Sequence, residues 1–230
     1  MRQYIYIILL MSCVVSNAQD SLTVEEDNRY REDQFYASIT YNLLTDNPAG
    51  VSQSNFSTGF HFGVIRDMPI NKRRNWAIGL GLGISSNSYN QNLVITEGVS
   101  GVNYDLEDDL SLGNVSKNKF TTYLIDIPFE LRWRTSTPST YKFWRIYPGF
   151  KISYVLFNSS KLRSDVLNNK ISNNDDFNTL QYGITLSAGY GTWNFQLYYG
   201  LNPIFDDSAQ LNANAIDSRA VRVGIIFYIL

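Results

Sequence analysis

Hydrophobic and polar residues alternate along most of this chain, from about Phe35 to its end. Between residues 75 and 85, every second position carries a large apolar side chain, and alanine, glycine or serine fills the positions between. The large residues are Trp76, Ile78, Leu80, Leu82 and Ile84. Because successive side chains of a β-strand point to opposite faces, this segment predicts a strand with one apolar face and one small, polar face.

Seven further segments show the same alternation. They span residues 35–43, 56–67, 119–134, 142–156, 180–191, 192–202 and 219–230. Each is long enough to cross a bilayer at the tilt of a barrel strand, and an apolar outer face over a small, polar inner face is typical of membrane barrels. We therefore predict an all-β fold, an eight-stranded antiparallel transmembrane β-barrel over residues 35–230, in contact with lipid.

The lengths of the connections predict how this barrel is oriented. The first, third, fifth and seventh are long, at about 44–55, 86–118, 158–176 and 203–217, whereas those at 67–75, 135–141 and 189–192 are short. Outer-membrane barrels have short periplasmic turns and long outer loops. All four tryptophans, Trp76, Trp133, Trp144 and Trp193, then lie on the lipid face at the periplasmic rim, where amphipathic rings are favoured.

The N-terminus predicts export. Arg2 precedes an apolar stretch that ends in Ser16-Asn17-Ala18, which indicates a cleaved signal peptide over residues 1–18. An alternative is a lipoprotein signal, because Leu10-Met11-Ser12-Cys13 is a loose lipobox. Residues 19–34 are charged and unpatterned, as in a flexible periplasmic leader. These features predict the outer membrane of a Gram-negative bacterium, and a net charge of -2 gives no reason to expect nucleic-acid binding.

The inward positions of two neighbouring strands carry a polar cluster. Its members are Asp126, Glu130, Arg132 and Arg134 from one strand, and Arg145 and Lys151 from the next. Opposite charges on adjacent strands can pair, whereas a lone buried charge is costly. Since an eight-stranded barrel has room inside only for side chains, we interpret this cluster as a rigid salt-bridged plug, with a proton or solute path as the alternative.

Enzymatic chemistry finds little support in the sequence. His61 is the sole histidine and lies mid-strand on the inward side, so we expect a structural role for it. The acidic residues Asp105, Glu107, Asp108 and Asp109 lack the glycine-punctuated spacing of a calcium loop, and a solvated loop is the preferred interpretation. We expect no catalytic residue, no bound metal and no cofactor.

Several segments resemble a known family. They are RDMPINKRRN (66–75), DIPFELRWRTSTPSTYKFWRIYPGFK (126–151), LSAGYGTWNFQLYYGLNPIFD (186–206) and VGIIFYIL (223–230). In these strands and turns the chain is similar to PorT, an outer-membrane barrel family of type IX protein secretion linked to gliding motility. The resemblance implies a role in that pathway and no biochemical activity.

The basic turn formed by Lys72, Arg73 and Arg74 could dock another, unidentified secretion protein, together with the neighbouring turn Thr135 to Lys142. A solubilising turn near anionic headgroups is the alternative. We therefore predict a non-catalytic secretion accessory. The other classes are a structural or adhesive barrel that acts through its outer loops, and an outer-membrane enzyme.

Overall fold

The computed structural model describes residues 33–98, 101–135 and 143–229. The predicted signal peptide lies outside these residues, as does the predicted leader except for Asp33 and Gln34, and Gln34 is the first residue of a strand. In the described part of the chain, no helix has the length and apolar character needed to cross a membrane.

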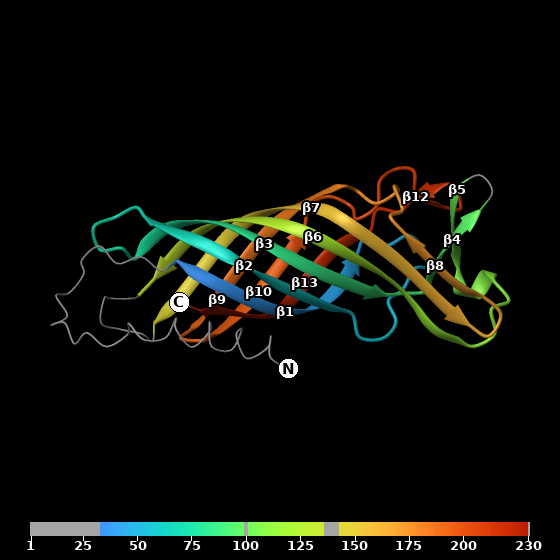
Figure 1. The fold of residues 1–230 in the computed structure, drawn as a ribbon, viewed down its shortest axis with the longest axis horizontal. Coiled ribbons are helices and arrows are strands. Elements are labelled where there is room, and N and C mark those ends of the chain that lie inside the picture. The colour runs from blue at the N-terminus through green and yellow to red at the C-terminus, as the bar shows by residue number, and fades with distance from the viewer. Residues whose placement is uncertain (1–32, 99–100, 136–142, 230) are drawn as a thin grey trace, which may run out of the picture. The chain divides into compact units, whose positions relative to one another are not determined.

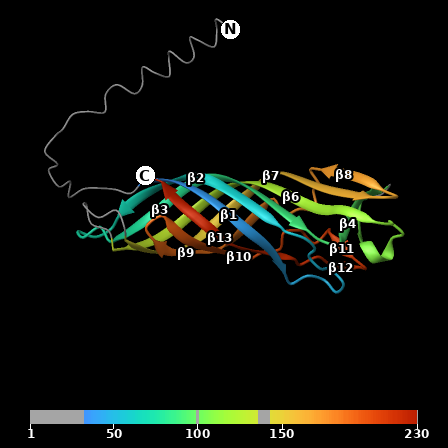
Figure 2. The ribbon, with the colours of Figure 1, turned by 90° about the horizontal axis from the view of Figure 1, so that it is seen from below.

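Eight antiparallel strands close into a barrel (Figure 1). Around the barrel their order is β6-β3-β2-β1-β13-β10-β9-β7, and β7 pairs with β6 to complete the ring. Their bounds are β1 Gln34–Thr45, β2 Thr58–Pro69, β3 Trp76–Asn90, β6 Val115–Arg134, β7 Trp144–Ser164, β9 Leu180–Tyr190, β10 Trp193–Gly200 and β13 Arg219–Ile229. The predicted fold class is confirmed. Figure 2 shows the last strand, β13, beside the first, β1.

The two faces of the barrel differ as the alternation predicts. On β3, Leu82 and Ile84 are 57% and 61% exposed, whereas the inward Ala77 and Asn87 are fully buried. The large apolar side chains of β3 therefore point outward, away from the barrel interior. In a soluble protein, side chains of this kind would be buried. The prediction that the apolar face of the strands points outward is confirmed.

Glycines on the inner face of β3 make room for long side chains from other strands. A Cβ atom added at Gly83 would collide with the hydroxyl of Tyr36, and one added at Gly79 would crowd the Cδ atom of Arg132. The small inward positions are thus paired with large ones across the interior, as in other packed barrels.

One end of the barrel, called the turn end here, carries the three short connections and the tryptophans. Trp76, Trp144 and Trp193 begin β3, β7 and β10, and Trp133 pairs with Trp76 across β3 and β6. Tyr190 pairs with both Trp144 and Trp193. The predicted position of all four tryptophans at one end is confirmed.

The opposite end, called the loop end, contains more regular structure than predicted. Strands β3, β6 and β7 continue into segments expected to be loops, and five short strands and a 3₁₀ helix fill the connections. These are β4 Leu93–Gly98, β5 Gly101–Leu106, η1 Glu107–Asp109, β8 Asn168–Ser172, β11 Gln210–Leu211 and β12 Asn214–Ala215. The predicted connections at 86–118 and 158–176 therefore begin later than expected, because the strand extensions pair with one another and β8 pairs with β7.

A β-bulge in β7 allows this extension. Val155 and Phe157 pair with the adjacent residues Leu124 and Tyr123 of β6, so Leu156 is an extra residue without a partner in that ladder. Both Leu156 and Phe157 are exposed, and beyond them the inward side of β7 changes from odd to even positions. A one-residue insertion has this effect because the side-chain period of a strand is two.

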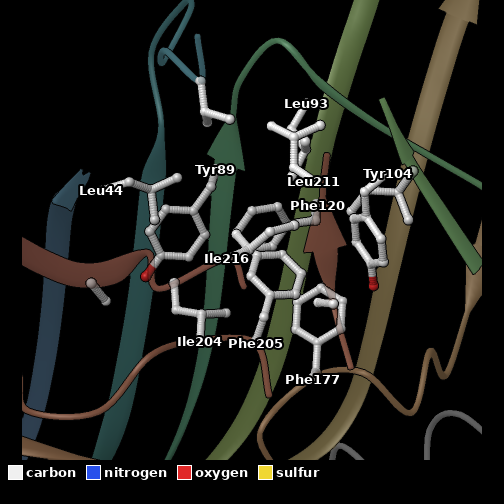
Figure 3. Packing of buried hydrophobic residues seen from close by; sticks show 14 of the residues in the cluster. Leu44, Tyr89, Leu93, Tyr104, Phe120, Phe177, Ile204, Phe205, Leu211 and Ile216 are labelled. Carbon is white, nitrogen blue, oxygen red and sulfur yellow. The ribbon is translucent and has the colours of Figure 1, made fainter. Parts of the chain in front are cut away.

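An aromatic cluster closes the interior at the loop end (Figure 3). Tyr89 of β3 stacks on Phe120 of β6 with ring centroids 4.9 Å apart, and Phe177 and Phe205 from two connections lie 4.5 Å apart against Phe120. Ile204, Leu211 and Ile216 from the last connection belong to the same cluster. The connections therefore share a core of their own above the barrel.

Candidate functional site

Asp67 holds two arginines, Arg132 and Arg134, near the turn end of the interior. The Oδ1 atom of Asp67 lies 2.9 Å from Arg132 Nη1 and 2.7 Å from Arg134 Nη1. The Oδ2 atom of Asp67 accepts a further hydrogen bond of 2.9 Å from Arg134. All three side chains are fully buried. The sequence placed Asp67 at the border between the predicted strand 56–67 and a short turn, and it lies within β2, which continues to Pro69.

Arg132 also joins the acidic and aromatic side chains in the middle of the interior. Its Nε atom lies 3.2 Å from Glu130 Oε2, and Gln34 accepts a hydrogen bond from its Nη2 atom. Its guanidinium lies over the ring of Tyr147, 4.5 Å from the centroid. Cation–π contact and carboxylate pairing together compensate the loss of water around this buried cation.

A second charged group lies deeper, around Asp126. Lys151 Nζ is 3.3 Å from Asp126 Oδ2, and Ser153 donates a hydrogen bond of 2.6 Å to Oδ1. His61 Nδ1 lies 3.8 Å from Asp126 Oδ2, and its Nε2 atom is 3.1 Å from the hydroxyl of Thr40. His61 is thus an inward, buried residue bound to its neighbours, far from either rim.

Two further buried arginines have no carboxylate within ion-pair distance among the described residues. Arg145 donates to the carbonyl oxygen of Gly191 at 2.5 Å and stacks on Phe143. Arg222 donates to the hydroxyl of Tyr89 at 3.1 Å and lies over the ring of Tyr198. The expectation that opposite charges pair across the interior therefore holds for Lys151, Arg132 and Arg134, and fails for Arg145, which lies at the turn end beside backbone and an aromatic ring.

The interior is filled by these side chains. A cavity lined by Tyr36, His61, Asp126, Glu130 and Lys151, among others, has a volume of only about 20 Å³. That is about the space occupied by one water molecule. Between the aromatic cluster and the Asp67 group, the side chains of the described residues therefore leave no space for a peptide at this cavity.

The basic turn is attached to this interior network. Lys72 and Arg73 are exposed, whereas Arg74 is half-buried and adopts a left-handed backbone with φ of 55°. The carbonyl oxygen of Arg74 accepts a hydrogen bond of 3.1 Å from Arg134 Nε, and the side chain of Asn71 bonds that of Asn75 at 2.6 Å. The guanidinium that binds Asp67 therefore also fixes the turn that presents Lys72 and Arg73.

The neighbouring turn begins beside the basic turn. The backbone N–H of Arg134 donates to the carbonyl oxygen of Asn75 at 2.9 Å, and the N–H of Thr135 donates to Trp144. Residues 136–142, which complete the predicted patch, lie outside the described residues. The described parts of the two turns are thus adjacent at their bases.

The acidic run of the longest connection is spread over two elements. Asp105 lies in β5 and the other three residues form η1, where Glu107 accepts a bond of 2.8 Å from the amide of Asn118. Within the described residues, no three His, Cys, Asp or Glu side chains are grouped to hold a metal ion. Nearby, Tyr104 donates to Asp176 at 2.8 Å, and burial raises the pKa of the Tyr104 hydroxyl well above its ordinary value.

Sequence reasoning missed several residues of the interior network. Gln34 was assigned to the leader and Asp67 to the border of a turn, and the role of Tyr147 and Tyr228 as ring partners of Arg132 was not recognised. The alternation contained a signal for these tyrosines, since each lies at an inward position of its strand.

Comparison with protein families identifies the family of this chain. Residues 17–206 match the family described as outer membrane protein beta-barrel domain, which covers most of the chain. Among curated proteins, no significant match is found.

Proposed function

This chain belongs to the outer membrane protein β-barrel family, and from that premise we propose that it is a non-catalytic accessory of type IX protein secretion that docks other secretion components. Its location is the outer membrane of a Gram-negative cell, where its apolar face contacts lipid. The secretion pathway is proposed from the resemblance of its strands and turns to the PorT family.

The filled interior is the observation that supports docking over transport. A barrel whose lumen holds a cavity of about 20 Å³ can act on proteins only through its two ends or its outer face. At the turn end, Lys72 and Arg73 project from a turn that Arg134 and the Asn71–Asn75 pair hold in place. A rigid, exposed basic turn suits an acidic partner, because preorganised charges steer association without an ordering cost.

The turn end must face the periplasm for this role, as short turns do in outer-membrane barrels. The sole cysteine of the chain is Cys13, so single cysteines can report the orientation. In whole cells, a membrane-impermeant maleimide should label Asp108→Cys in η1. It should label Lys72→Cys only after the outer membrane is permeabilised. The reverse order of labelling would contradict the orientation.

The docking role is tested with Lys72→Gln and Arg73→Gln combined, a variant that leaves Arg74 and its bond to Arg134 in place. We expect normal folding, because exposed turn residues contribute little to stability, and reduced secretion of cargo from the same cells. Partner recovery after cross-linking should fall, and further at high ionic strength, because screening weakens the charges that remain.

The control is Arg219→Gln, which removes a partly exposed positive charge at the other end of the barrel, where Arg219 lies 3.6 Å from Asp46. It should leave secretion and partner recovery at wild-type levels. Heat-modifiable gel mobility reports folding in every variant. A folded Lys72/Arg73 variant with normal secretion would dismiss the basic turn as a docking site.

The two other classes make different predictions. An enzyme would need a base near a nucleophile at an accessible position, yet the only histidine of the chain, His61, is buried in mid-barrel beside Thr40. An adhesive barrel would act through its outer loops, in which Phe177, Phe205 and Ile204 pack inward while Phe56 and Val166 are exposed. Deletion that abolishes cargo secretion while other outer-membrane proteins assemble normally would favour the secretion role over both.

A further inference from the structure

Five basic residues cover one outward face of the strands that extend past the barrel at the loop end. This surface, called the basic flap here, comprises Lys117 and Lys119 of β6, Lys161 and Arg163 of β7, and Lys170 of β8. Three of the five are exposed and two are partly exposed. Figure 1 shows β7 and β8 side by side at this end.

The register places these like charges directly opposite one another. Lys161 pairs with Lys119 on one side and with Lys170 on the other, and Arg163 pairs with Lys117. Like charges at opposed strand positions are destabilising. Among the described residues, none of the five forms an ion pair with a carboxylate. The flap thus carries a repulsion that the described part of the chain does not neutralise.

This repulsion acts on the lysines themselves. The neighbouring Arg163, together with burial and the other basic residues of the flap, lowers the pKa of Lys161. This shift is what a cluster of cations without a counter-ion produces, and an anion placed beside Lys161 would reverse the effect.

The opposite face of the flap holds the charges in this orientation. Phe120 and Leu162, which alternate with the lysines, are buried, and Leu162 packs with Val94 of β4 and Leu112. The flap is therefore two-sided, with an apolar face against the folded connections and a basic face turned outward, in the same direction as the lipid-facing residues of β6.

The height of the flap matches the membrane surface. On the same strands, Tyr123 and Phe157 form an exposed aromatic pair with centroids 5.6 Å apart, and the exposed Ile127, Phe129 and Ile152 lie below it. Lys119 and Lys161 are each four residues beyond this pair. At the rise and tilt of barrel strands, four residues correspond to about 10 Å, which places the lysines at the level of the outer-leaflet headgroups.

From this geometry we propose that the basic flap is a binding site for the phosphate groups of the phosphorylated glycolipid in the outer leaflet. Lysines at one height on the side of the barrel face the headgroups of neighbouring lipids. A soluble polyanion would instead contact the loops from the aqueous phase. Ammonium groups suit phosphate as point charges, and several of them near a bilayer act together. The site is independent of the secretion role, because it rests only on the membrane location and on a loop end that faces outward.

The test measures retained lipid on the full-length mature barrel, purified in neutral detergent and incubated with lipid A as the probe. We expect the wild type to retain phosphorylated lipid A and to retain little of the dephosphorylated form. Lys161→Gln combined with Lys170→Gln should weaken retention about 30-fold at low ionic strength, since each basic residue near an anionic surface adds about a factor of five. Mass spectrometry of the extracted lipid provides the measurement.

Arg219→Gln is the control, because it removes a positive charge at the loop end away from the flap, and its retention should equal that of the wild type. Folding is checked by heat-modifiable mobility, and Lys170→Gln alone, on the short strand β8, gives a second variant with a smaller expected loss. Equal retention by a folded flap variant, or equal retention of dephosphorylated lipid A, would overturn the proposal. Displacement of lipid A by inorganic phosphate at equal concentration would assign the site to a free anion instead.

Discussion

Replacing Asp67 by asparagine is expected to destabilise the barrel by about 3 to 5 kcal/mol, the cost of leaving a buried cation without its partner. Asp67 is the carboxylate that both Arg132 and Arg134 bind, and all three side chains are fully buried. The change leaves the shape of the side chain intact and removes only its charge. Reversible urea unfolding in lipid vesicles, followed by tryptophan fluorescence, measures the free energy of unfolding.

Combining Asp67→Asn with Arg134→Gln tests the cause. Arg134 is one of the two cations that Asp67 binds, so its removal should recover part of the lost stability, and the effects of the two substitutions should not add. Asp165→Asn, at an exposed position beyond β7, should change the free energy of unfolding little. A loss no larger than this control in the Asp67 variant would show that the ion-pair group contributes nothing to stability.

Replacing Leu80 by arginine is expected to cost about 2 to 4 kcal/mol, because a charge near the middle of the lipid face must be buried in hydrocarbon. Leu80 lies on the exposed face of β3, midway between Trp76 at the turn end and Ile84. Leu197→Arg, on β10, should behave in the same way. Assembly in the outer membrane, assayed by heat-modifiable mobility, should fall with the stability measured in vesicles.

The matched control for depth is Ser86→Arg, on the same face and strand but beyond the last large apolar residue. Near the interface the cost should fall to about 0 to 1 kcal/mol. Leu80→Phe controls for the change in size and should be tolerated. Similar costs for arginine at positions 80 and 86 would contradict the assignment of this face to lipid.

Much of the barrel was predictable because its signal is local. A strand that separates lipid from a polar interior must alternate, and β3 shows this in its own residues without reference to any other strand. The end of the barrel at which the tryptophans lie was also predictable, since Trp76 and Trp193 each follow a short turn. The inward position of Asp126 and Lys151 followed from the same parity.

The loop end was not predictable in this way. The outward face of β7 beyond Phe157 depends on the bulge at Leu156, which shifts the parity of every later residue. The alternation that predicted the strand ended at residue 156, so it could not predict which later residues of β7 point outward. The basic flap was hidden for this reason: Lys161 and Lys170 become neighbours only through the pairing of β7 with β8.

By itself, the sequence determined the strand periodicity, the lipid-facing side and the end at which the tryptophans lie, because each depends on residues close together in the chain. Only the tertiary structure decided which charges meet. Asp67 and Arg134 are 67 positions apart and Tyr89 and Arg222 are 133 apart, and side chains so distant become partners only when the barrel closes. Ring closure sets which strands face each other across the interior, and it thereby decided that the lumen is filled. The pairing of β6, β7 and β8 beyond the ring decided that the lysines of the flap become neighbours.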